Sequence, residues 1–141
     1  MKRLALDLGA RFVGVAWHEE EGVPARPLPT LDLQAERSLQ LAVIALVTQT
    51  GAEELIVGLP LHLDGREGLA ARNARKMGAS LQKRTGLPVH FVDERLTTTE
   101  AQRARIARGV KGRSGIDSEA AAIMLQTWVD MQARREHPEA L

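Results

Sequence analysis

The chain has 141 residues, of which 44% are hydrophobic and 26% are charged, and its formal net charge is +1. This length and hydrophobic fraction are typical of one domain with a buried core, which we expect to span residues 1–141. The lack of cysteine excludes disulfides and thiolate metal sites, and no apolar run is long enough for a signal peptide or a membrane span, so a cytoplasmic location is expected.

Short apolar runs predict three strands near the N-terminus. Arg3–Leu8 and Phe12–Trp17 are expected to form a hairpin with a turn at residues 9 and 10. A third strand is expected somewhere in the range Val23–Leu31, where three prolines restrict it to an edge of the sheet.

Helices and further strands are expected to alternate through the rest of the chain. Ala35–Thr50 has apolar residues at helical spacing, and Thr97 with Glu100 forms a capping box that begins another helix. The last helix is expected to be capped by Ser114 or Asp117. The other predicted elements are a strand at Glu54–Val57, a loop at Gly58–Gly68, a helix at Leu69–Arg84, a strand at Val89–Val92 and a glycine-rich basic loop at Gly109–Gly115.

This order of elements predicts an α/β fold. An antiparallel meander of three strands followed by parallel crossovers gives a mixed five-stranded sheet, and the crossovers place helices on both of its faces. The tail from about residue 133 is charged and contains Pro138, so we expect it to be frayed.

Basic side chains are concentrated in the second half of the chain. Residues 1–64 carry 5 basic and 9 acidic side chains, a net of −4, whereas residues 65–141 carry 14 and 9, a net of +5. Two stretches, Gly68–Val92 and Ala101–Ile116, contain several basic residues and no acid. Such stretches occur in proteins that bind nucleic acid and also on helix faces exposed to solvent, so charge alone leaves both interpretations open.

Three carboxylates stand where they could carry chemistry. Asp7 interrupts an apolar strand, where burying a carboxylate is costly unless a positive group meets it. Glu94 follows a strand at the sheet edge where α/β proteins bind ligands, and because strand residues alternate, only one of Asp93 and Glu94 readily faces that edge. Asp117 stands at the start of the last helix. Each acid also has a structural interpretation, namely bonding to turn amides for Asp7, a surface turn for Glu94 and a helix cap for Asp117.

The three acids together favour a metal site. Carboxylates that converge in a cleft repel and raise one another's pKa unless divalent cations neutralise them. Two cations about 3.5 to 4 Å apart, bridged by one carboxylate, activate a water and stabilise the leaving oxygen in phosphodiester hydrolysis. Oxygen ligands without cysteine favour Mg²⁺ or Mn²⁺. The spacing in the sequence is compatible with this arrangement.

Four ordered motifs resemble those of the YqgF/RuvX family of bacterial nucleases, which are described as Holliday junction resolvases and as pre-16S rRNA processing nucleases. These motifs are LALDLG with VGVAW, IVGLPLHLDG, VHFVDERLTTTEA and GIDSEAA, and they extend over roughly residues 3–126. The resemblance implies an RNase H-like fold and a metal-dependent phosphodiesterase that acts in rRNA processing, DNA recombination or both. It places the catalytic, metal-binding acids of the family on Asp7, Glu94 and Asp117, with two Mg²⁺ or Mn²⁺ ions.

The chain departs from the family pattern beside these acids. Leu8 stands where an aromatic residue is usual, and His62 stands where the loop usually has Asn. Because both Asn and His can donate to a phosphate, we expect His62 near the nucleic acid, with an exposed loop histidine as the alternative. Arg95 is expected to orient Glu94 or to contact phosphate, unless it forms only a surface ion pair.

The basic loop that precedes Asp117 is expected to bind phosphates that flank the cleaved bond, unless it is merely solvated. Its candidate nucleic-acid-binding residues are Arg108, Lys111 and Arg113.

Two other functions fit parts of the sequence. An actin-like ATP-binding or phosphotransfer module shares the core fold and an Asp-x-Gly turn, but it needs a second domain that 141 residues cannot supply. A noncatalytic nucleic-acid-binding protein would need the basic stretches but not Asp7. Because only 3% of the residues are aromatic, base stacking is disfavoured and binding by shape and phosphate contact is expected.

The substrate and the oligomeric state are not fixed by these motifs. A resolvase makes paired cuts across a two-fold axis, whereas an RNA-trimming enzyme needs one site. No apolar helix stripe is left over for a large interface, so we expect a monomer or a weak homodimer that acts on structured RNA, with branched DNA as a further substrate.

Overall fold

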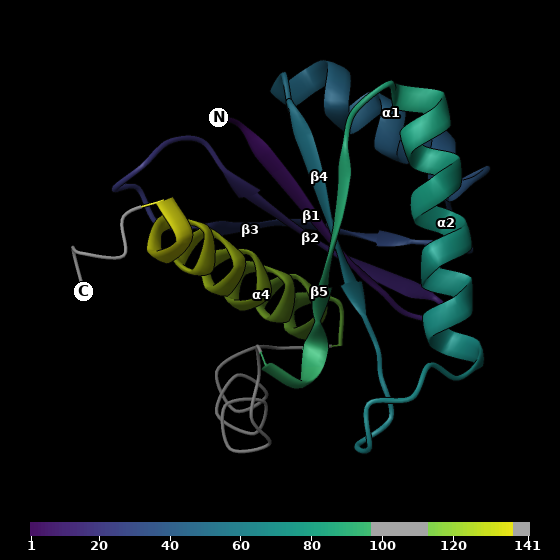
Figure 1. Cartoon of the computed structure of the whole chain (residues 1–141). Coiled ribbons are helices and arrows are strands. Elements are labelled where there is room, and N and C mark those ends of the chain that lie inside the picture. The colour runs from purple at the N-terminus through teal and green to yellow at the C-terminus, as the bar shows by residue number, and fades with distance from the viewer. Residues whose placement is uncertain (97–112, 137–141) are drawn as a thin grey trace.

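The computed structural model describes residues 1–96 and 113–136. Its elements follow the predicted order (Figure 1). The helix expected from Thr97 and residues 109–112 of the expected basic loop lie outside the described residues. The last three residues of that expected loop, 113–115, are helical instead. The elements are β1 (Arg3–Leu8), β2 (Phe12–His18), β3 (Arg26–Asp32), α1 (Leu39–Thr50), β4 (Glu54–Leu59), α2 (Leu69–Thr85), β5 (Val89–Asp93), the 3₁₀ turn η1 (Glu94–Leu96) and α4 (Arg113–Glu136).

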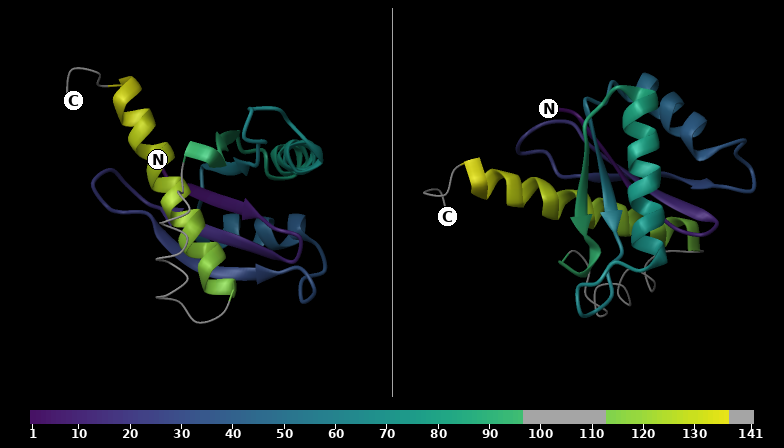
Figure 2. Two further views of the ribbon diagram at one scale, coloured as in Figure 1. Left: turned by 90° about the horizontal axis from the view of Figure 1, so that it is seen from below. Right: turned by 45° about the vertical axis from the view of Figure 1, so that its right-hand side comes forward.

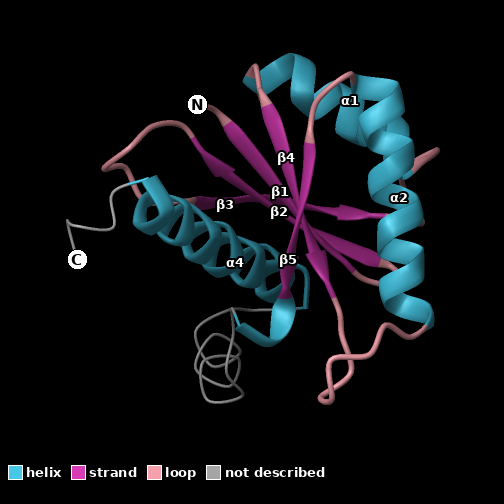
Figure 3. Ribbon diagram, viewed as in Figure 1, coloured by secondary structure: helices cyan, strands magenta, loops and turns pink. Residues whose placement is uncertain are grey.

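The predicted mixed sheet is confirmed. Five strands lie in the order β3-β2-β1-β4-β5, with β1, β2 and β3 antiparallel and with β4 and β5 parallel to β1 (Figure 3). The proline-rich strand β3 lies at one edge, as expected, because a proline has no N–H to donate to a second neighbouring strand. β1 lies at the centre of the sheet, so the ladder bonds of both neighbours fix its backbone.

Helices cover both faces of the sheet, with α1 and α2 on one side and α4 on the other (Figures 1 and 2). Strand alternation supplies a separate core to each face. In β1, Leu4 and Leu6 belong to the cluster under α1 and α2, whereas Ala5 packs with Leu125 and Trp128 of α4. The small side chains on the α4 face, Ala5 and Ala16, allow this helix to lie close to the strands.

The start of α1 is four residues later than expected. Ser38 caps the helix by accepting a hydrogen bond from the Leu41 amide at 3.0 Å, and the amide of Ala35 instead closes a turn by donating to the carbonyl of Asp32. The helix ends at Gly51, whose φ of 73° is favoured in a residue without Cβ.

α4 is longer than expected at both ends. It already includes Arg113, so Asp117 lies past its first turn and the predicted capping role for Asp117 is wrong. The helix continues to Glu136, so the residues from 133 to 136 that were expected to fray are helical, and the remaining tail lies outside the described residues. No helix within residues 1–96 and 113–136 has the length and apolarity needed to cross a membrane.

Candidate active site

The α4 face of the sheet changes in chemistry along the strands. Arg3, Ala5 and Asp7 all point to this face because they alternate with the core residues of β1. The end near Arg3 is polar, the middle is apolar, and the end near Asp7 is acidic. The acidic end lies at the carboxyl edge of the parallel strands, where α/β sheets bind ligands.

Asp7 lies opposite Gly14 in the β1–β2 ladder. Gly14 is buried, and an added Cβ there would overlap the carbonyl oxygen of Asp117 and lie 3.0 Å from the amide nitrogen of Ser118. The first turns of α4 therefore rest directly on β2 beside Asp7. A glycine at this position is what allows the helix backbone to approach the strand so closely.

Ser118 fixes this contact. Its hydroxyl accepts a hydrogen bond from the Val15 amide at 3.2 Å and forms another with the hydroxyl of Thr30. The β2–β3 register shifts between Val13 and Val15, which leaves the Val15 amide available for the serine. Since Ser118 is 3% exposed, these bonds anchor α4, and with it Asp117, to strands β2 and β3.

Glu94 reaches the same end of the sheet from β5. Leu6 pairs with Val57, and this register brings Gly58 of β4 next to Asp7. An added Cβ on Gly58 would overlap the Oε1 atom of Glu94 and lie 2.8 Å from the Sδ atom of Met124 in α4. Gly58 thus leaves space for the Glu94 carboxylate between the sheet and α4.

The structure therefore gathers Asp7, Glu94 and Asp117 at one end of one sheet face. The Oε1 atom of Glu94 and the Oδ2 atom of Asp117 are shielded from solvent. Hard carboxylate oxygens are the ligands that Mg²⁺ and Mn²⁺ prefer, so the donor chemistry fits such ions. Within residues 1–96 and 113–136, however, no three acids or histidines stand close enough together to form a complete metal-binding group as they lie.

Asp93 and Glu94 point to opposite faces, as strand alternation predicts. Asp93 binds Arg95, with Nη2 and Oδ2 2.7 Å apart, and this guanidinium holds the pKa of Asp93 below its usual range. Arg95 contacts Asp93 on the side of β5 opposite to Glu94. Among the described residues, Arg95 therefore does not orient Glu94 as expected.

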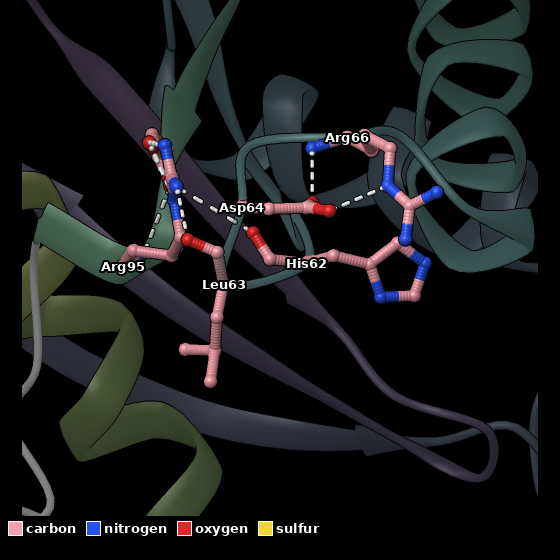
Figure 4. Close-up of polar contacts among 6 residues, drawn as sticks. His62, Leu63, Asp64, Arg66 and Arg95 are labelled. Carbon is pink, nitrogen blue, oxygen red and sulfur yellow. Dashed lines mark hydrogen bonds and ion pairs between the residues drawn. The ribbon is translucent and has the colours of Figure 1, made fainter.

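Arg95 also holds the loop between β4 and α2. Its Nη1 atom donates to the carbonyls of Leu63 at 3.1 Å and His62 at 3.5 Å, as Figure 4 shows. Within the loop the His62 amide donates to the Arg66 carbonyl, and Asp64 pairs with Arg66 (Figure 4). The His62 side chain is exposed and its ring lies against Gly68. This loop stands at the same edge of the sheet as the three acids.

The basic loop is only partly described. Arg108 and Lys111 lie outside the described residues, and of Arg113 only the backbone, at the start of α4, is placed. The contribution of this loop to the site therefore stays a prediction.

Sequence reasoning missed the residues that position the acids. Gly14 and Gly58 are interior strand glycines, a pattern that often marks close approach of another backbone, and this signal was available in the sequence. Ser118 stands beside Asp117 in the GIDSEAA motif, but its partner on β2 becomes visible only in the folded chain.

The polar end of the same face contrasts with the acidic end because its charges are paired. Arg3 and Glu54 form a buried salt bridge of 2.6 Å, and His90 contacts the second oxygen of Glu54 at 3.1 Å. The Arg3 guanidinium also lies over the ring of Trp128 and touches His18, whose pKa is lowered by burial and by Arg3. This cluster joins three parallel strands to α4 and is structural.

The mixed five-stranded sheet with helices on both faces is an RNase H-like fold. Two solved structures of Thermus thermophilus RuvC share the fold. One, described as RuvC, has a TM-score of 0.60 at 14% identity and covers 94% of this chain and 97% of its own. The other, described as RuvC in complex with Holliday junction substrate, has a TM-score of 0.61 at 18% identity and covers 94% and 96%.

The chain belongs to the RuvX family, described as Holliday junction resolvase, whose model matches residues 1–131. A relative from Anaeromyxobacter sp. (strain Fw109-5) is 39% identical over 136 residues, which cover 92% of this chain and 97% of the relative. A relative from Nitrosococcus oceani is 40% identical over 136 residues, which cover 95% of this chain and 90% of the relative. Both relatives bear the name "Putative pre-16S rRNA nuclease". The predicted family is thereby confirmed.

Proposed function

We propose that this protein is a divalent-metal-dependent endonuclease that hydrolyses phosphodiester bonds in structured nucleic acid, with Asp7, Glu94 and Asp117 as its catalytic carboxylates. The observation that carries the proposal is their arrival, from β1, from the end of β5 and from α4, at the carboxyl edge of one sheet face. Two buried glycines leave the space that this arrangement needs.

The proposed site works by holding acids rigidly in place. Bound Mg²⁺ or Mn²⁺ ions would supply an activated water and charge for the leaving 3′-oxygen. Asp7, on the central strand, is the acid best placed to lie between Glu94 on one side and Asp117 on the other. Because Ser118 and Gly14 hold the backbone of Asp117 against β2, the point from which its carboxylate projects is fixed.

Arg95 and His62 would meet the nucleic acid at this edge. Arg95 stabilises the loop by bonding two of its carbonyls, and the exposed ring of His62 is free to donate to a phosphate. Arg108, Lys111 and Arg113 would bind phosphates on the α4 side of the cut.

The substrate that we favour is structured RNA, in processing of the 5′ end of pre-16S rRNA, with branched DNA cut by the same site. The names of the relatives support the RNA substrate, and the description of the family supports the branched DNA substrate. One site per chain suffices for RNA trimming, so we propose a monomer or a weak homodimer. Sedimentation over a range of concentrations, with and without a four-way junction, tests this state.

The activity is tested by offering the purified protein a labelled four-way DNA junction and a labelled structured RNA precursor side by side. We expect cleavage with Mg²⁺ or Mn²⁺ and none with a chelator. The protein would instead be a noncatalytic binder if it bound either substrate and left it intact at every metal concentration. Equal cleavage in the chelator would refute the metal requirement.

A further inference from the structure

The outer face of α2 carries a row of basic side chains on the side of the sheet opposite to α4. Arg72, Lys76 and Lys83 are exposed and recur at intervals of four and seven residues, so they line one side of the helix. The opposite side packs on the sheet through its buried residues, which are Ala71, Ala74, Gly78 and Leu81. The three basic residues, called the α2 stripe below, therefore point away from the core.

The α2 stripe differs from Arg66 and Arg75 nearby in lacking an acid partner. Arg66 pairs with Asp64 and Arg75 with Glu67. Among the residues that the structure describes, no residue of the stripe forms a salt bridge, and no acid occurs from residue 68 to residue 92. Its charge is thus available to an anion from outside the chain.

The stripe is held at a fixed distance from the sheet. An added Cβ on Gly78 would lie 3.0 Å from the Cε1 atom of Phe91 and 3.3 Å from the Cγ1 atom of Val89, so α2 lies tightly against β5. Along the helix, Arg72 and Lys83 are about 16 Å apart at 1.5 Å per residue. That is the length of about five base pairs at 3.4 Å each, or about half a turn of a duplex, so the stripe matches a segment of nucleic-acid backbone better than a small anion.

The position of the stripe relative to the acids determines how a bound nucleic acid must run over the protein surface. α2 begins beside the loop at the carboxyl edge and runs back along the sheet, on the face opposite to α4 (Figures 1 and 2). A nucleic acid that contacts both the acids and the stripe must therefore turn around the carboxyl edge. A straight duplex pays an elastic cost for this turn, whereas a branch point or a bulge already contains it.

We infer that the α2 stripe binds the backbone phosphates of a helical arm that leaves the site at an angle, and that it thereby favours branched or bulged substrates over straight duplex. This inference rests on the proposed nuclease function and adds a second contact surface to it.

The test compares two variants that each lose three positive charges. One carries Arg72→Gln, Lys76→Gln and Lys83→Gln. The matched control carries Lys2→Gln, Arg134→Gln and Arg135→Gln, which are exposed residues at the start of β1 and the end of α4. Binding to a four-way junction and to a linear duplex of equal base-pair number is measured by fluorescence anisotropy in a chelator, from about 50 to about 200 mM salt.

We expect the stripe variant to flatten the slope of log affinity against log salt on the junction by about 2 to 3, since each lost phosphate contact contributes about 0.9. The control should keep the slope of the wild-type protein, and the linear duplex should change little. Equal slopes for both variants on the junction would overturn the inference, as would an equal flattening on junction and duplex.

Cleavage separates this inference from the proposed function. With Mg²⁺, the stripe variant should raise KM for the junction and leave kcat unchanged, and the melting temperatures of both variants should match that of the wild-type protein. If the wild-type protein cleaves nothing, the proposed function fails, while the salt slopes still decide whether the stripe binds an arm.

Discussion

The backbone of Asp117 in α4 rests directly on Gly14 in β2, where an added Cβ would overlap the Asp117 carbonyl oxygen. Gly14 in turn lies opposite Asp7 in the β1–β2 ladder. The spacing between these two acids is therefore set by backbone packing rather than by the acids themselves, which would repel each other.

Replacing Gly14 with Ala should push α4 away from β2. We expect the free energy of unfolding to fall by about 1 to 3 kcal/mol, as for other overpacked sites. Cleavage measured well below the melting temperature should fall much further than this loss explains, because Asp117 moves with the helix. Denaturant unfolding and single-turnover cleavage check the two parts. Normal cleavage by a destabilised Gly14→Ala protein would show that the position of Asp117 does not matter.

Glu94 and Asp93 provide a matched pair, because they are adjacent acids on opposite faces. Glu94→Gln should abolish cleavage and leave the fold intact. Asp93→Asn should retain metal-dependent cleavage, since it removes only the ion pair with Arg95. Rates with Mg²⁺ at saturating substrate distinguish the two. Normal cleavage by Glu94→Gln together with loss of cleavage in Asp93→Asn would place the site on the other face of the sheet.

The sheet and its strand order follow from the sequence because alternation, prolines and glycine turns are local signals. The edge position of β3 is an example, since Pro27 and Pro29 exclude a central strand. The boundaries of α4 do not follow in this way. The seating of α4 on the sheet likewise depends on the contact of Ser118 with the Val15 amide, more than a hundred residues earlier in the chain, which no local pattern encodes.

The candidate acids of the proposed site stand out in the sequence, but their surroundings do not. Asp7 is anomalous within an apolar strand, and alternation separates Asp93 from Glu94. The same alternation places Arg95 on the side of Asp93, two residues earlier, and the structure pairs these two residues. The space beside Glu94 depends on Gly58, a residue of another strand.

The polar end of the α4 face should contribute to stability and not to cleavage. Glu54→Gln leaves the charge of Arg3 buried without a carboxylate, because the two side chains are only 8% and 10% exposed. We expect a loss of about 3 kcal/mol in the free energy of unfolding, a typical cost of breaking a buried pair. Cleavage at low temperature should be unchanged. A catalytic defect in a folded Glu54→Gln protein would contradict this division of the face.

His18 should make stability depend on pH. Burial and the nearby Arg3 lower the pKa of His18 in the folded chain, so as pH falls below about 6.5 the unfolded chain takes up a proton there before the native chain does. The free energy of unfolding should therefore decrease between about pH 7 and pH 5, and less steeply in His18→Gln. Denaturant unfolding at several pH values measures both slopes. Equal slopes would mean that His18 is not the group responsible.

The proposed metal site is tested most directly by cleavage by Asp7→Asn over a full titration of Mg²⁺ and Mn²⁺, on whichever substrate the wild-type protein cuts. We expect no cleavage at any metal concentration, together with a metal-free melting temperature equal to or above that of the wild-type protein, because the change removes a charge that repels Glu94 and Asp117. Cleavage by Asp7→Asn at the wild-type rate would contradict it.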